Sequence, residues 1–223
     1  MLAGQAVMVN WSNVAVEHRP AYYRWHGCEH MVGRLAIPGY RRGRRFAAVA
    51  ANRDFLVLYE VEDIAVITGQ NYLVKANNPS ALTLATTQYV KDSARALARV
   101  RLSMGIGQGG FMLTLRFDAE ERNASRLDRF VRDAIRGAAQ LPGVVGAHFC
   151  VADMSASAMV PRERQGRPTT IPRWIVLLEG ITGGALGDAA NRHLATASLI
   201  EHGAAGSIER DVYAHQITVS NVG

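Results

Sequence analysis

The sequence predicts an α+β fold with two halves of one kind, each with the element order β-α-β-β-α-β of a ferredoxin-like unit. Three observations predict it. A helix-breaking Pro-Gly turn before a strand occurs twice, as Ile37-Pro38-Gly39-Tyr40 and Leu141-Pro142-Gly143-Val144. An apolar strand that ends in glutamate also occurs twice, at 55–60 and 174–179. A glycine-rich stretch at 105–110 lies between the two halves and has the composition of a linker.

In the first half, apolar periodicity and chain breakers predict the elements in order. A β-branched run comes first, a helical segment ends at the Pro38-Gly39 pair, and the loop residues Asn77-Asn78-Pro79-Ser80 separate two later helices. We expect a strand at 5–10, a helix at 20–36, hairpin strands at 40–50 and 54–61 around a turn at 51–53, helices at 65–74 and 82–92, and a strand at 94–103.

The second half repeats this order after the linker. We expect a strand at 111–117, a helix at 122–139, strands at 144–151 and 174–179, a helix at 187–202 and a last strand at 210–220. The connection at 153–173 is long and rich in Ser, Pro and Arg, so we expect it to be mobile. The predicted organisation is a first ferredoxin-like repeat at 1–104, the linker at 105–110 and a second repeat at 111–223, packed sheet to sheet so that each buries the other's apolar face.

Composition narrows the class of protein. The chain is 48% hydrophobic with a mean hydropathy of −0.01, which is typical of a globular protein. It lacks both the run of about 20 apolar residues that a membrane helix needs and a signal-peptide pattern, so we expect no membrane association and a cytoplasmic location. The two cysteines, Cys28 and Cys150, are too few for a disulfide framework or a paired zinc site, and reduced thiols are expected.

The net charge of +6 comes almost wholly from arginine, because Lys75 and Lys91 are the only lysines. The arginines are spread over both halves, and no zinc finger, helix-turn-helix or RNA-binding aromatic signature accompanies them. Charge alone indicates non-specific attraction. The sequence therefore argues against a nucleic-acid partner and favours a small-molecule ligand.

The densest polar cluster is His26, Glu29 and His30, next to Trp25 in the first predicted helix. Helical spacing places the two histidines on one face with the glutamate beside them, and a carboxylate next to an imidazole suits acid/base catalysis. The same letters fit an inverted zinc-peptidase pattern, but a ferredoxin-like unit is the wrong context for it, so we expect no metal. The alternative is that these side chains only pack in the core.

The stretch Trp25-His26-x-x-Glu29-His30, followed by Arg34-Leu35-Ala36-Ile37-Pro38-Gly39-Tyr40 and Gly43-Arg44-Arg45-Phe46, resembles bacterial proteins of the dimeric α/β-barrel superfamily. The resemblance implies that the two repeats form an intrachain pseudo-dimeric α/β barrel, in which two sheets close around a pocket. That superfamily includes cofactor-free monooxygenases, polyketide cyclases, lactone isomerases and haem enzymes. Fold alone does not choose among these activities.

The two halves differ at the cluster. Aligning their Pro-Gly turns places Phe130, Asp133 and Ala134 opposite the two histidines and the glutamate, which predicts one functional site per chain. In the strand that follows the first turn, alternation puts Tyr40, Arg42, Arg44 and Phe46 on one face, and His148 aligns with Arg44. We expect Trp25, Arg34, Tyr40, Arg42, Arg44 and His148 to bind an anionic or enolisable substrate, unless the arginines only solubilise an edge strand.

The resulting hypothesis is a small-molecule enzyme of proton-transfer type, an isomerase, cyclase or lyase, that acts in the barrel pocket without metal or cofactor. His30 would be the general base or acid and Glu29 its orienting group, while His26 and an arginine would hold an oxyanion. The alternatives are a non-catalytic metabolite-binding or assembly module, and a haem protein that uses His26, His30 or His148. Asp153, Arg162, Arg164 and Arg167 would belong to a lid or to an ordinary insertion, and a homodimer is the default assembly.

Overall fold

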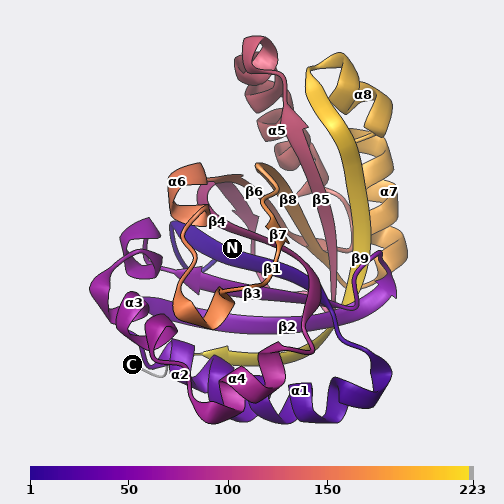
Figure 1. Cartoon of the computed structure of the whole chain (residues 1–223). Coiled ribbons are helices and arrows are strands. Elements are labelled where there is room, and N and C mark those ends of the chain that lie inside the picture. The colour runs from indigo at the N-terminus through magenta and orange to yellow at the C-terminus, as the bar shows by residue number, and fades with distance from the viewer. Residues whose placement is uncertain (221–223) are drawn as a thin grey trace.

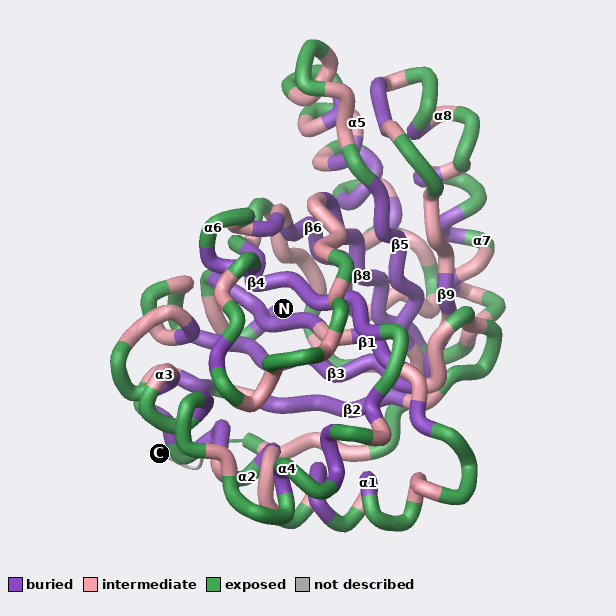
Figure 2. The backbone as a smooth tube through the Cα atoms, viewed as in Figure 1, coloured by how far each residue is buried: buried purple, intermediate pink, exposed green. Residues whose placement is uncertain are grey.

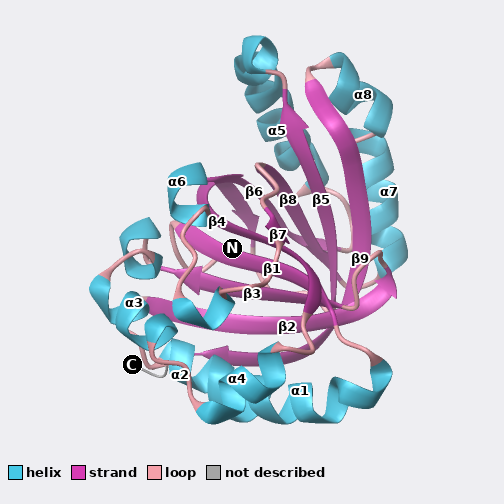
Figure 3. Ribbon diagram, viewed as in Figure 1, coloured by secondary structure: helices cyan, strands magenta, loops and turns pink. Residues whose placement is uncertain are grey.

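The computed structural model describes residues 1–220, in which nine strands form one sheet (Figure 3). The strand order is β1-β3-β2-β9-β5-β8-β6-β4-β7, and β1 also pairs with β4, so that eight antiparallel strands close into a barrel. The strands are β1 Ala6–Asn13, β2 Tyr40–Ala50, β3 Phe55–Val61, β4 Lys91–Gly105, β5 Phe111–Ala119, β6 Val144–Ala152, β7 Thr169–Thr170, β8 Trp174–Gly180 and β9 Ala204–Ser220. The short β7 runs parallel to β4.

Each half contributes four neighbouring strands, in the orders β4-β1-β3-β2 and β9-β5-β8-β6. The predicted fold class, two ferredoxin-like units in a pseudo-dimeric α/β barrel, is therefore confirmed. The units are joined along their edges, because β2 pairs with β9 and β4 pairs with β6. Closure leaves no free edge in the eight-stranded ring, and the inner faces meet across its interior.

Helices cover the outer face of each half (Figure 1). The first half carries α1 Arg19–Trp25, a π-helical turn His26–His30, α2 Met31–Leu35, α3 Gln70–Asn77 and α4 Ala81–Thr87. The second carries α5 Ala124–Ala138, α7 Gly183–His193 and α8 Thr196–Glu201. The connection at 153–173 includes α6 Met154–Ser157, a 3₁₀ turn Arg162–Arg164 and β7. Short 3₁₀ turns at Val16–His18, Ile64–Ile67 and Glu121–Asn123 complete the described elements, and none of the helices in residues 1–220 is long and apolar enough to cross a membrane.

The buried side chains form layers on both sides of the barrel wall, and Figure 2 shows the strands buried along most of their length. One layer fills the barrel interior and includes Trp11, Phe46 and Leu58. A second lies between the first half's sheet and helices and includes Met31 and Tyr72. The largest, between α5, α7 and the second half's sheet, consists mostly of aliphatic and aromatic side chains.

The chain turns sharply where the sequence predicts breaks. Gly39 and Gly143 have φ angles of +90° and +84°, a left-handed conformation that glycine adopts without a Cβ penalty. The predicted helix at 82–92 ends earlier, at Thr87, because Lys91 already pairs with Asn13 of β1 and begins β4. Strand pairing over a long edge here outweighs the helical pattern.

Candidate functional site

A cavity of about 60 Å³ lies outside the barrel, between the first half's helices and the outer face of its sheet. Three parts of the chain line it. The helices contribute Trp25, His26, His30 and Arg34, the strands contribute Met8, Asn10, Tyr59 and Arg95, and the connection contributes Glu163, Arg164 and Arg167. Four of the predicted site residues, Trp25, His26, His30 and Arg34, are thus brought together in one place.

His26 lies at the inner end of this cavity and is buried. Its Nδ1 is 3.3 Å from Nη1 of Arg45, and its Nε2 is 3.4 Å from the hydroxyl of Tyr59. Burial, with a smaller contribution from Arg45, lowers the pKa of His26 to about 3. His26 is therefore neutral at physiological pH and can accept or donate a hydrogen bond, but it cannot serve as a fixed cation.

His30 follows one π-helical turn later, with its ring centroid 4.5 Å from that of Trp25 and 5.8 Å from that of His26. Burial, followed by Arg34 and His26, holds the pKa of His30 well below its ordinary value. No hydrogen bond between residues 1–220 involves its ring. His30 therefore presents a neutral imidazole whose acceptor nitrogen is available to a ligand.

Glu29 points away from the histidines, towards the start of α4. Its carboxylate accepts hydrogen bonds from the hydroxyls of Ser80, at 2.5 Å, and Thr83, at 3.1 Å, while Trp25 donates its Nε1–H to Thr83. Ser80 also caps α4 by accepting from the backbone N–H of Thr83. Glu29 thus ties α4 to the π-helical turn, and no contact in residues 1–220 places it as the orienting group of His30.

The cavity wall carries an excess of positive charge. Arg34, Arg95, Arg164 and Arg167 line it, and Glu163 is the only carboxylate among the lining residues. Arg34 is 2% exposed and donates through Nη2 to Glu163, which raises the pKa of Arg34 against the opposing effect of burial. Burial, together with Arg95 and Arg167, lowers the pKa of Arg164. Such a wall favours an anion.

Several buried polar atoms of this wall have no hydrogen-bond partner among residues 1–220. They are Nε and Nη1 of Arg34, Nε of Arg167 and Oδ1 of Asn10. Buried polar groups are normally paired, and an unmade hydrogen bond to a charged group is costly. These atoms therefore mark positions that a ligand can satisfy.

A second cavity of about 160 Å³ adjoins the first. It is lined by Glu29, Lys75, Asn78, Pro79, Ser80 and Thr83, and it shares His30, Arg34 and Glu163 with the first cavity. We call the first the inner cavity and this one the outer cavity. His30 is mostly buried and lines both cavities.

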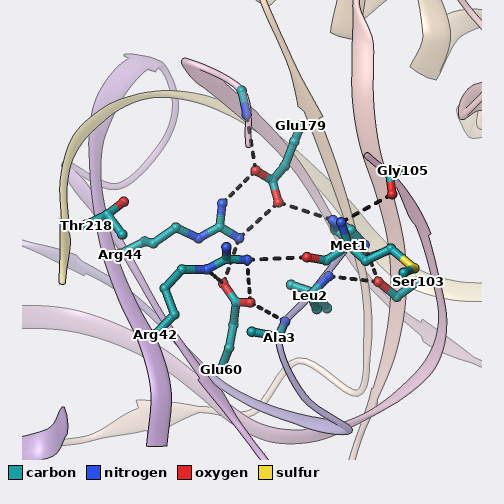
Figure 4. A network of polar contacts seen from close by, with 12 residues as sticks. Met1, Leu2, Ala3, Arg42, Arg44, Glu60, Ser103, Gly105, Glu179 and Thr218 are labelled. Carbon is teal, nitrogen blue, oxygen red and sulfur yellow. Dashed lines mark hydrogen bonds and ion pairs between the residues drawn. The ribbon is translucent and has the colours of Figure 1, made fainter. Parts of the chain in front are cut away.

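The remaining predicted binding residues lie elsewhere. Arg44 and His148 are fully buried in the barrel, and Figure 4 shows Arg44 beside Glu60 and Glu179. Arg44 forms ion pairs with Glu60, at 2.9 Å, and with Glu179, at 2.6 Å, and His148 contacts Glu179 at 3.1 Å. Arg42 pairs with Glu60 at 2.7 Å. These charges neutralise one another inside the barrel wall and do not reach His26 or His30.

The first residues of the chain cover this end of the barrel. The backbone N–H of Ala3 donates to Glu60 at 2.7 Å, and that of Leu2 donates to Ser103 at 3.0 Å. Ser103 is in turn 2.9 Å from Nδ1 of His148. The barrel interior at this end is thus a closed polar network (Figure 4).

Tyr40 lies on the opposite face of β2 from the one predicted. A shift of register between Tyr40 and Arg42 inserts an extra residue opposite β3, so the alternation expected from Tyr40 to Phe46 is broken. Tyr40 is consequently buried in the helix-side layer with Met31 and Tyr72, while Arg42 and Arg44 face inwards.

Sequence reasoning missed part of the cavity wall. It named Arg164 and Arg167 as parts of a lid but not Glu163, Arg95 or Tyr59. The sequence contains a pattern that could have identified Arg95 as a functional residue. It is a charged residue between Ala94 and Ala96, in a strand whose other residues are mostly small or apolar. No sequence pattern could have identified Glu163, because it reaches Arg34 only when the connection is folded.

The residues present do not fit a metal or a haem. Within residues 1–220 no group of three or more His, Cys, Asp or Glu side chains is arranged to hold a metal ion. His30 is the type of neutral ligand that haem iron takes, but the cavities beside it measure only about 60 and 160 Å³. Sites for large ligands usually measure about 300–1,000 Å³, so a porphyrin does not fit this conformation.

No family model matches the sequence, and no curated protein matches it. Solved structures do match the fold. An anthrone oxidase-like protein has a TM-score of 0.65 at 11% identity and covers 98% of this chain and 93% of its own. A haem-binding protein of Thermus thermophilus has a TM-score of 0.56 at 9% identity, with 96% and 92% covered.

A ferredoxin-fold protein of Listeria monocytogenes, described as related to antibiotic biosynthesis monooxygenases, has a TM-score of 0.52 at 9% identity and covers 97% of both chains. At these identities the likeness shows the fold alone. The chain therefore has a barrel fold that is found among small-molecule enzymes and haem-binding proteins.

Proposed function

We propose that the protein is a small-molecule enzyme that transfers a proton on an anionic or enolisable compound, bound between the first half's helices and the outer face of its sheet. The observation that carries the proposal is the combination of a neutral, unpartnered His30 with an arginine-rich wall. The proposed site lies outside the barrel, whereas the sequence hypothesis put it in the barrel pocket.

His30 would accept the proton. In the free site its pKa is low because it is buried near cations, which makes it a weak base. An anionic compound on the arginines offsets those cations and raises the pKa of His30 towards the range in which a base works well at neutral pH. The base thus becomes effective when an anion is present.

The arginines would stabilise the charge that develops on the substrate oxygen as the proton leaves. Arg34 offers two buried nitrogen donors, Nε and Nη1, that have no partner in the described chain, and Arg167 offers one, its Nε. Donors that are already in place and partly shielded from water stabilise an oxyanion without reorganisation. His26 and Tyr59 would fix the other side of the substrate through a hydrogen bond to its neutral part.

The test uses 4-nitrophenol, whose absorption reports its ionisation. We expect the protein to bind it as the phenolate below the pH at which it ionises in water, with the proton taken up by His30. The variant His30→Asn keeps a polar side chain and should lose this absorption shift, while His193→Asn on α7 in the other half should keep it. Unfolding temperature is the control for folding.

An absorption shift that persists in folded His30→Asn would refute the role of His30. Binding of the neutral phenol with no shift in any protein would leave the non-catalytic binding module as the better explanation.

A further inference from the structure

We infer that the Arg34–Glu163 ion pair is a gate between the inner and outer cavities, and that the ligand is a small aromatic carboxylate whose carboxylate replaces Glu163 on Arg34. The inference rests on the proposed function and adds to it the class of ligand and the way it enters.

The two cavities meet at this pair. His30, Arg34 and Glu163 line both of them, so the Glu163 carboxylate and the Arg34 guanidinium form the partition. The inner cavity, of about 60 Å³, has room for a few water molecules but not for a ligand with an aromatic ring. If Glu163 leaves, the inner cavity joins the outer one of about 160 Å³, and His26 becomes reachable from the surface.

Glu163 already makes the contact that a ligand carboxylate would make. It accepts one charge-assisted hydrogen bond from Nη2 of Arg34, and Nε and Nη1 of Arg34 stay without a partner in the described chain. Trp25 and Tyr59 supply flat apolar surface in the inner cavity, which suits an aromatic ring. The side chain of Glu163 thus stands in for the ligand in the closed site.

The chain around Glu163 is held at both of its ends. Before it, Ser157 is held to the backbone of Leu97, and after it, Thr169 pairs with Ser93 in the two-residue strand β7. We call residues 158–168, between these two anchors, the strap. In Figure 1 the connection, in orange, runs from α6 towards α3 and α4 and returns as β7.

The strap makes few bonds to the rest of the molecule. Besides the ion pair to Arg34, the backbone N–H of Arg162 donates to Asn77, and Gly166 adopts a φ of +73° at the strap's turn. The side chains of Arg167 and Arg164 bond within the strap or to Thr169, so they do not tie the strap to the helices or to the barrel.

The positive charge of the cavity wall should make opening of the gate selective for anionic ligands. The wall holds four guanidinium groups against one carboxylate, so release of Glu163 alone would leave a buried cluster of cations. An incoming anion removes this cost, whereas a neutral compound does not. Opening is therefore coupled to binding of a carboxylate, and an amide of the same shape should fail to open the gate.

The first experiment measures calorimetric binding of benzoate and of benzamide, its neutral counterpart. In Glu163→Gln the amide can still accept from Arg34, which preserves the fold, but it competes weakly with a carboxylate. We expect benzoate affinity to rise about tenfold, the effect of one charge-assisted contact. Benzamide binding should not change, and Glu121→Gln, at an exposed acid of the second half, should bind benzoate like the unmodified protein.

The second experiment needs no variant. Amide hydrogen exchange in the strap should accelerate in the unmodified protein when benzoate is added, and should stay unchanged with benzamide. Slower exchange with benzoate would overturn the gate, because the strap would then close over the ligand instead of being displaced.

Equal benzoate affinity of the unmodified protein and Glu163→Gln would also overturn the gate while leaving the anion site of the proposed function in place. If neither protein binds benzoate but the phenolate shift with 4-nitrophenol persists, the carboxylate class is refuted and proton transfer stands. If both probes fail, the proposed function falls with the inference.

Discussion

Replacing Arg44 by methionine should destabilise the protein without affecting ligand binding. Arg44 is fully buried and neutralises Glu60 and Glu179, whose side chains are 0% and 1% exposed. Removing one partner of a buried ion pair typically costs about 3–5 kcal/mol, because the other charge stays buried without compensation. Arg42 still pairs with Glu60, and His148 still contacts Glu179, so we expect the lower part of that range.

The free energy of unfolding that Arg44→Met loses should depend on pH. Burial alone would raise the pKa of Glu179, but hydrogen bonds from His148 and Arg44 hold it well below its ordinary value. A carboxyl whose pKa is depressed by folding contributes stability above its unfolded pKa and loses that contribution as the pH falls through the folded pKa. Without Arg44 burial dominates and the pKa of Glu179 rises, so the penalty is present at neutral pH and shrinks as the pH falls through that raised pKa, which lies above about pH 4.

Urea unfolding of the Arg44→Met variant and the unmodified protein at neutral and acidic pH measures this difference. A loss of less than about 1 kcal/mol at neutral pH would refute the reasoning, since that is the range of an exposed pair. So would a folded variant that no longer binds 4-nitrophenol as the phenolate, because that result would place Arg44 in the site and return the site to the barrel interior.

Two further predictions concern the site's response to pH and the turn that ends its helix. Anion binding raises the pKa of His30 from its depressed value towards its ordinary value of about 6.5, so benzoate affinity should increase with uptake of a proton as the pH falls below about 6.5, and His30→Asn should lose this dependence in calorimetry. Gly39→Ala places a Cβ 2.5 Å from a methyl carbon of Val66 at a φ of +90°, and should lower stability by about 1–3 kcal/mol in thermal unfolding. Gly107→Ala, which meets nothing within 4 Å, is its matched control and should be tolerated.

The order of elements could be predicted from the sequence because it depends on local chemistry. The Pro-Gly turns before Tyr40 and Val144 stop a helix and start a strand wherever they occur, and alternating apolar residues define strands with a buried face. The β-α-β-β-α-β order then allows few topologies. The face of Tyr40 could not be predicted, because one inserted residue opposite β3 reverses the alternation that a pattern assumes.

Only part of the candidate site could be predicted from the sequence, and the reason is a different one. Trp25, His26, His30 and Arg34 lie within one helical region, so their spacing already places them near one another. Glu163 comes from the other half of the sequence, and no local pattern links it to Arg34. His148 and Arg44 were expected at the ligand because arginine and histidine often bind anions, but Glu60 and Glu179 pair with them across strands.

The two halves share a topology but differ in what fills the space between helices and sheet, and this difference favours one site per chain. In the second half, Leu127 and Val131 of α5 and Leu186 of α7 form one continuous apolar layer with Phe149 and Trp174 of the sheet. In the first half, the corresponding space holds two neutral histidines and a set of arginines with unmade hydrogen bonds.

Burying polar groups there costs stability that the apolar layer of the second half can offset, since both halves belong to one closed barrel. The second half also supplies the strap that reaches over the first half's site. An arrangement in which one half stabilises the barrel and covers the proposed site, while the other would bind the ligand, is consistent with the different residues, Phe130, Asp133 and Ala134, that align with the histidine cluster.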